Sequence, residues 1–225
     1  MIKYELLNFI NPEAKSPFSP RWDYTIGLFD INEIYRVSSL FHFLLEKEKE
    51  ILKKYTEASS DGGTGLGPNS LTSKYKNYTI WEFEELSFLK KIIKECHDIY
   101  LDKLNLPEEN NVYCQGWFNV MRSGEKIKRH IHSDPESSYN YLSAHITVTN
   151  SDTHTNYFNP ITNEEWKEKN YSGKLTIFPS YISHSTDSVP EDDPRNRITL
   201  AFDMITEEGY HKDIFENKKC RWHKL

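Results

Sequence analysis

The spacing of apolar residues predicts two helices in the first half of the chain. From about residue 30 to about residue 55, apolar side chains recur every three or four positions, which is the period of an amphipathic helix. A second stripe of the same period begins at Ser87, which we expect to be its N-cap. His97 lies off this stripe and is expected to face solvent. Residues 1–28, which contain three prolines, indicate extended chain with a possible edge strand.

The second half of the chain alternates apolar and polar residues, which predicts strands. The clearest case is residues 141–149, where Leu, Ala, Ile and Val alternate with Tyr, Ser, His and Thr. The other predicted strands are residues 112–121, 127–132, 156–159, 173–178, 184–189 and 197–204, and residues 161–172 are interpreted as a polar loop. If the apolar face packs on the helices, the polar face lines an interior that is suited to a polar ligand.

Length and composition limit the classes of protein. A chain of 225 residues is enough for one well-cored domain and short for two, so we predict a single domain over residues 1–225. Helical support is expected at about residues 30–105, and the core at about residues 111–205. The net charge of -6 and the lack of a basic block argue against a nucleic-acid duplex as partner.

The same composition argues against a membrane protein. No apolar run approaches the roughly 20 residues of a membrane span, and the first residues lack the apolar region of a signal peptide. The three cysteines form neither a metal spacing nor a disulfide framework, so a reducing, cytoplasmic location is expected. The oligomeric state cannot be read from the sequence.

Three residues in the second half have the chemistry of an iron site. His132, Asp134 and His184 would give two imidazoles and one carboxylate, which occupy one face of an octahedral Fe(II) and leave the other face open. The open positions can take a bidentate 2-oxo acid and then O₂. The planar fork of Arg197 matches the remote carboxylate of 2-oxoglutarate, and Thr199 shares its face of the strand.

Other polar residues leave alternatives open. His130 has the same parity as His132 on a strand, so it is either a rival iron ligand or a contact to a ligand or substrate. Arg195 follows a proline and is expected to be a turn residue. Further candidates for hydrogen bonds to 2-oxoglutarate are Asn119, Tyr141 and His145, which otherwise simply fill a hydrated pocket.

These motifs resemble a known family. The matching stretches are Trp117–Gly124, His130-x-His132, Gly173–Ser180, His184 and Arg197–Phe202. Residues from about 60 to 204 resemble the core of the 2-oxoglutarate/Fe(II)-dependent oxygenases, and more narrowly a putative 2OG-Fe(II) oxygenase family of bacteria and phages. One departure concerns the metal strand, which in that family often reads His-x-His-Pro-Gly. This chain has Asp134 two residues after the second histidine, and about five extra residues before the next strand.

The resemblance implies an α+β fold, a cupin-like double-stranded β-helix (jelly roll) with N-terminal supporting helices. It also implies a dioxygenase that decarboxylates 2-oxoglutarate to succinate and hydroxylates a C–H bond of an unidentified primary substrate. Asp134 argues against a halogenase, in which the position of the carboxylate is vacated for halide. The alternatives are a cupin-like zinc or manganese hydrolase or isomerase, which needs no clamp such as Arg197, and a non-catalytic binding protein.

A glycine-rich stretch at residues 62–69 does not fit a phosphate-binding loop, because no Gly-Lys-Ser/Thr follows it. We expect this stretch to be a mobile loop, and the resembling family carries a similar one. A lid close to the active site is therefore a further hypothesis.

Overall fold

The computed structural model describes residues 2–14, 16–18, 22–57, 61, 63–74, 80–133, 139–217 and 221–225, and at 216 and 217 the backbone alone. Its strands are β1 (Lys3–Phe9), β2 (Tyr24–Asp30), β3 (Tyr113–Met121), β4 (Leu142–Thr147), β5 (His154–Phe158), β6 (Glu165–Lys169), β7 (Lys174–Pro179), β8 (Ser183–Thr186), β9 (Arg197–Ile205) and β10 (His223–Lys224). Its helices are α1 (Ile34–Lys54), α2 (Ser87–Lys103) and α3 (Glu207–Asn217), with 3-10 turns at Leu71–Ser73, Ile80–Glu82 and Glu84–Leu86.

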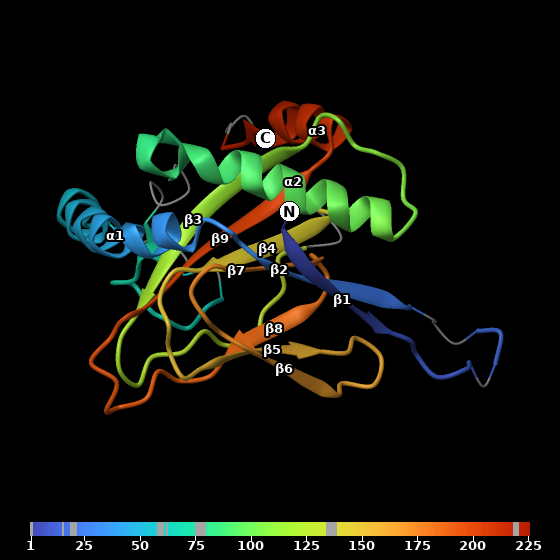
Figure 1. Cartoon of the computed structure of the whole chain (residues 1–225), viewed down its shortest axis with the longest axis horizontal. Helices are drawn as coiled ribbons and strands as arrows, with labels where there is room; N and C mark the ends of the chain where they lie inside the picture. Colours follow the sequence, from blue (N-terminus) through green and yellow to red (C-terminus); the bar gives the residue numbers. More distant parts are fainter. Residues whose placement is uncertain are drawn as a thin grey trace.

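The strands form two antiparallel sheets. The larger sheet has seven strands in the order β1-β2-β7-β4-β9-β3-β10, and the smaller has three in the order β6-β5-β8. Helices α1 and α2 cover one face of the larger sheet, and the smaller sheet lies on the side away from these helices (Figure 1). The centre of the larger sheet therefore has an apolar face towards the helices and a second face towards the smaller sheet.

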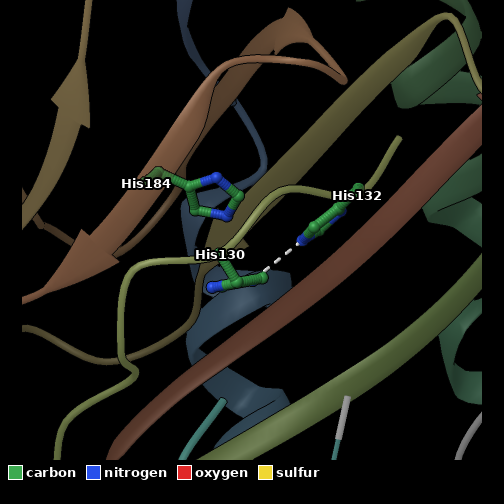
Figure 2. Close-up of side chains that lie close together, drawn as sticks. All are labelled: His130, His132 and His184. Atoms are coloured by element: carbon green, nitrogen blue, oxygen red, sulfur yellow. Dashed lines mark hydrogen bonds between the residues drawn. The ribbon is translucent and has the colours of Figure 1, made fainter. Parts of the chain in front are cut away.

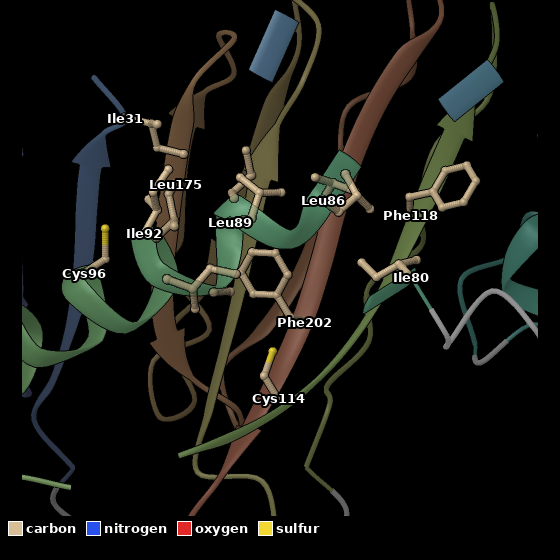
Figure 3. Packing of buried hydrophobic residues seen from close by; sticks show 14 of the residues in the cluster. Ile31, Ile80, Leu86, Leu89, Ile92, Cys96, Cys114, Phe118, Leu175 and Phe202 are labelled. Atoms are coloured by element: carbon tan, nitrogen blue, oxygen red, sulfur yellow. The ribbon is translucent and has the colours of Figure 1, made fainter. Parts of the chain in front are cut away.

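The apolar core lies between the helices and the larger sheet. In Figure 3, Leu89 and Ile92 of α2 lie against Leu175 and Phe202 of the sheet. Leu89, Leu175 and Phe202 are completely buried, and each such side chain contributes about 1.5–3 kcal/mol through burial. The alternation that was predicted for β4 and β9 is confirmed, because their apolar residues belong to this core while their polar residues face the smaller sheet.

The possible edge strand in residues 1–28 is confirmed, because β1 lies at one edge of the larger sheet. It pairs with β2, a further strand, which pairs in turn with β7 in the register Gly27↔Ile177. One other prediction about strands was wrong. Residues 161–172 are not simply a loop, because they contain β6, which pairs with β5. β6 is an edge strand whose outward side chains are charged, so it lacks the apolar alternation by which strands are recognised.

The predicted strand 127–132 is irregular. It forms one bridge, at His130, whose backbone N–H and C=O exchange hydrogen bonds of 3.0 and 2.9 Å with His184. The segment nevertheless runs along β8, because the N–H of Thr186 also binds the carbonyl of Ile127 at 3.1 Å. Ser87 is likewise not the N-cap of α2; Leu86 has that position and makes no side-chain capping bond.

Within the ranges that the structure describes, no helix is both long enough and apolar enough to cross a membrane.

Candidate metal and co-substrate site

A cavity of about 560 Å³ lies between the two sheets. Its walls come from β3, β4, β7 and β9 of the larger sheet, from β5 and β8 of the smaller sheet, and from the irregular segment before residue 133. The glycine-rich loop contributes Asp61 and Thr64, and the C-terminal segment contributes Asp213, Arg221 and Trp222. This volume is in the range of small-molecule sites.

Three histidines meet at one point of the cavity wall. The nearest ring nitrogens of His130, His132 and His184 all lie within 4.8 Å of one another. The Nε2 atoms of His130 and His132 are 3.1 Å apart, and the ring of His184 has its centre 4.4 Å and 4.9 Å from the other two rings. Figure 2 shows the three rings around one space, with His184 arriving from β8. The bridge between residues 130 and 184 is what brings the two distant segments together.

The hydrogen bonds of the three rings fix their tautomers. The Nδ1 atom lies 2.8 Å from the carbonyl of Lys128 in His130, 2.7 Å from Oδ1 of Asp203 in His132, and 3.2 Å from the carbonyl of Ile182 in His184. Since these oxygens only accept, each Nδ1 donates its proton, and in a neutral ring each Nε2 keeps a lone pair.

The protonation of the rings favours lone pairs at the centre of the cluster. Burial, reinforced by the neighbouring His132, lowers the pKa of His130 to about 4. Burial, with the neighbouring histidines, also lowers the pKa of His184 well below its usual value. Without a metal, one of the two Nε2 atoms 3.1 Å apart must carry a proton for the pair to hydrogen-bond, whereas two lone pairs at this distance need a cation between them. Two ligands at right angles, each about 2.1 Å from one metal ion, would be about 3.0 Å apart, so the donor set fits a metal that accepts imidazole.

A buried guanidinium lies in the same cavity. Arg197, at the start of β9, is 1% exposed, and burial lowers its pKa to about 10. Its Nη1 lies 3.6 Å from the sulfur of Met121 and its Nη2 lies 3.4 Å from the hydroxyl of Thr155, while its Nε has no hydrogen-bond partner in the described part of the chain. No carboxylate of the described residues lies within 4.0 Å of it. An unpaired buried cation is costly, so the site is suited to an anionic ligand.

Further buried polar atoms of the cavity lack partners among the described residues. They include Oδ1 of Asn119 and Nδ1 of His145, whose Nε2 lies 2.8 Å from the Tyr157 hydroxyl. Burial lowers the pKa of His145 to about 3, so its ring is neutral near pH 7. Thr199 also lines the cavity. Because buried polar atoms in native proteins are usually hydrogen-bonded, these positions can serve a ligand.

Tyr141 and Asp134, two of the predicted site residues, are not among the described residues that line the cavity. Tyr141 does not line the cavity, because its hydroxyl lies 2.6 Å from Nε2 of His97 and its ring packs against the helix-side core. It lies one residue before β4, so the alternation of that strand does not orient it. His97 is fully buried by this contact, contrary to the prediction that it faces solvent. Asp134 lies outside the described residues.

Sequence reasoning assigned no role to several residues at the site. Asp203 shares a face of β9 with Arg197, so the alternation of the strand could have identified it. Trp117 shares a face of β3 with Asn119, and its ring centre is 5.3 Å from that of His132. Trp222 is 8% exposed and donates to Asp213 at 2.7 Å, but no pattern in the polar tail places it at the cavity.

The central part of the chain matches a known family. Residues 115–203 match the family described as "Putative 2OG-Fe(II) oxygenase". This range includes the three histidines and Arg197, so the predicted resemblance is confirmed there. Iron and 2-oxoglutarate are the metal and co-substrate for which this family is named. No curated protein sequence matches the chain.

Solved structures show the same fold at low identity. The non-heme alpha ketoglutarate dependent epimerase SnoN from nogalamycin biosynthesis is 10% identical with a TM-score of 0.53, covering 80% of this chain and 77% of SnoN. CytC3 with Fe(II) and alpha-ketoglutarate is 15% identical with a TM-score of 0.50, covering 79% and 70%. A Pseudomonas putida prolyl-4-hydroxylase is 15% identical with a TM-score of 0.45; the match covers 55% of this chain and 66% of the hydroxylase, just under two thirds. The likeness to SnoN and CytC3 confirms the jelly-roll prediction.

Proposed function

From the match of residues 115–203 to the 2OG-Fe(II) oxygenase family, we propose that this protein is an Fe(II)- and 2-oxoglutarate-dependent dioxygenase that hydroxylates its substrate. The observation that carries the proposal is the presence, in one cavity, of three converging imidazoles and a buried guanidinium without a carboxylate partner among the described residues. The first feature suits a metal ion, and the second suits an acidic ligand beside it.

The iron ligands in this proposal are the Nε2 atoms of His130, His132 and His184. His130 takes the third position because its Nε2 is 3.1 Å from that of His132 and its Nδ1 is satisfied by a backbone carbonyl. Three neutral imidazoles leave the full double charge on Fe(II). The carboxylate of 2-oxoglutarate next to the keto group would offset part of that charge, since the remote carboxylate pairs with Arg197.

Arg197 binds the remote carboxylate of 2-oxoglutarate, because its fork can donate two parallel hydrogen bonds. Thr199 adds a hydroxyl from the same face of β9, and Asn119 and His145 are further polar contacts. When bound with O₂, the iron and the 2-oxo acid supply the oxidising chemistry that yields succinate and a hydroxylated substrate. The chain contributes ligands, orientation and shelter from water, to which the ring of Phe178, 4.8 Å from that of His184, contributes.

The best alternative is a cupin-like metal hydrolase or isomerase. Such an enzyme would use the three imidazoles equally well, but it has no need of an unpaired cation 1% exposed in the same cavity. Binding of 2-oxoglutarate therefore separates the two functions.

The test is anaerobic titration of the protein with Fe(II) and 2-oxoglutarate, followed by the visible charge-transfer band that an iron-bound 2-oxo acid produces. We expect a saturable band in the wild type, and succinate after admission of O₂. His184→Ala and His130→Ala should lose the band, whereas Asp134→Ala should keep it. His154→Ala is the matched control, since His154 lies on β5 but does not line the cavity.

The absence of any band in the wild type would contradict the oxygenase proposal. Loss of the band in Asp134→Ala together with its retention in His130→Ala would instead assign the iron to His132, Asp134 and His184. Each result is distinct, because the first concerns the co-substrate and the second only the identity of one ligand.

A further inference from the structure

Asp203 is a buried carboxylate on β9 that faces the cavity and contacts one of the three histidines. It is 4% exposed, and its Oδ1 accepts hydrogen bonds of 2.7 Å from both His132 Nδ1 and the Ser143 hydroxyl. Its Oδ2 accepts a hydrogen bond of 3.2 Å from the side-chain amide of Gln115. No lysine or arginine in the described ranges lies within 4.0 Å of this carboxylate. Its negative charge is therefore directed at His132.

The position of Asp203 is set by strand register. Gln115 lies directly opposite it on β3, and Ser143 lies directly opposite it on β4. The carboxylate is thus held by a neighbour on each side, in the middle of the larger sheet. Such a group cannot easily move away from the imidazole that it contacts.

The other two histidines have neutral partners. The Nδ1 atoms of His130 and His184 donate to backbone carbonyls, those of Lys128 and Ile182. A carboxylate stabilises positive charge on an imidazole far better than a carbonyl does, and it makes the opposite ring nitrogen a stronger donor to a metal. His132 is therefore electronically different from its two neighbours.

We infer that Asp203 is a positioning residue that acts on the metal through His132. Its carboxylate does not touch the metal, but through the histidine it supplies the negative charge that three neutral imidazoles lack. This inference rests on the proposed function, because it takes the three histidines as the iron ligands. It predicts that the charge of Asp203, and not only its hydrogen bond, strengthens metal binding and enriches the metal in electrons.

Asp203→Asn separates the charge from the hydrogen bond. The new side-chain oxygen can still accept from His132 and Ser143, and the amide of Gln115 can turn so that its oxygen accepts from the new NH₂ group. The matched control is Asp187→Asn. Asp187 accepts from His154 Nδ1 at 2.9 Å, which is the same type of pair, but it does not line the cavity.

The experiment measures Co(II) affinity, by the visible absorption of the bound ion, and the position of the Fe(II)–2-oxoglutarate charge-transfer band. We expect Asp203→Asn to weaken Co(II) binding about 10- to 100-fold, as loss of an outer partner of a metal-bound histidine typically does. The band should move to higher energy, because a less electron-rich iron gives up an electron less readily. Asp187→Asn should change the affinity less than about twofold and leave the band in place.

An unmoved band and a Co(II) affinity within about twofold of the wild type in Asp203→Asn would overturn the inference while leaving the oxygenase proposal intact. An equal loss in Asp187→Asn would also overturn it, since the effect would then not depend on the cavity. A wild type that binds Co(II) but gives no band with Fe(II) and 2-oxoglutarate would instead contradict the proposed function. A wild type that binds no Co(II) would overturn both.

Discussion

Replacement of Arg197 probes the co-substrate site most directly. The guanidinium is 1% exposed, and its hydrogen-bond partners among the described residues are a thioether at 3.6 Å and a hydroxyl at 3.4 Å. Arg197→Met removes the charge and keeps an unbranched apolar side chain in its place. We expect this variant to retain iron, because Arg197 is not one of the three converging donors, and to bind 2-oxoglutarate much more weakly.

The size of the loss follows from the burial of the site. Truncating one partner of a buried, hydrogen-bonded charge pair typically costs about 2–5 kcal/mol. At about 1.4 kcal/mol per factor of ten, this corresponds to roughly 30- to several-thousand-fold weaker binding. Arg197→Lys should recover only part of the affinity, because an ammonium group lacks the planar fork. Neither neutral neighbour of Arg197 can take over its role.

Isothermal titration of 2-oxoglutarate into protein loaded with Fe(II) or Mn(II) measures the effect. Arg195→Ala is the control, because Arg195 is exposed and its guanidinium already binds Asp193 at 2.8 Å. An unchanged affinity in Arg197→Met, or a larger loss in Arg195→Ala, would refute the reasoning. Without 2-oxoglutarate, Arg197→Met should unfold at no lower a temperature than the wild type, because it removes an unpaired buried cation.

Three further predictions concern the support of the site. Arg122→Ala should lower the free energy of unfolding by about 1–3 kcal/mol, because it leaves the buried carboxylate of Glu48, 6% exposed, without the guanidinium that binds it. An unchanged denaturation midpoint would contradict this prediction. Protease cleavage within residues 63–69 should fall when Fe(II) and 2-oxoglutarate are added. It should rise in Asp61→Ala, because the Asp61 carboxylate accepts hydrogen bonds from three N–H groups of the loop. Equal cleavage with and without the ligands would exclude a lid. When free metal is present at about 100 times its dissociation constant, binding raises the free energy of unfolding by about 2.7 kcal/mol. A chelator should remove this stabilisation and lower the melting temperature of the wild type, and it should not affect His184→Ala.

Sequence periodicity predicted those parts of the fold in which one face is buried. The helices near residues 34–54 and 87–103, and the two faces of β4 and β9, follow from regular spacing of apolar residues. The same alternation placed Arg197 and Thr199 inside the cavity, because a strand with one apolar face must turn its other side chains the opposite way.

Features that depend on distant partners could not be predicted in this way. His97 is buried where it hydrogen-bonds the partly buried Tyr141, 44 positions away in the sequence, and neither residue alone carries that information. β6 is a strand because β5 offers it a partner, although its own sequence is polar. The sequence favoured Asp134 over His130 as the third ligand, but His130 shares the parity of His132, so the pattern alone left His130 as a rival.

The pairing of β2 with β7 has a consequence for the order in which the chain folds. Gly27 meets Ile177 about 150 positions later, so at a synthesis rate of about 5–20 residues per second the N-terminal hairpin waits roughly 8–30 s for its partner. Contacts of such long range also slow the folding of a complete chain. Helices α1 and α2 are made long before most of the sheet that they cover, which leaves their apolar faces exposed during that interval. His184 is made within seconds of β7, so the three histidines can come together only after β7 has been made.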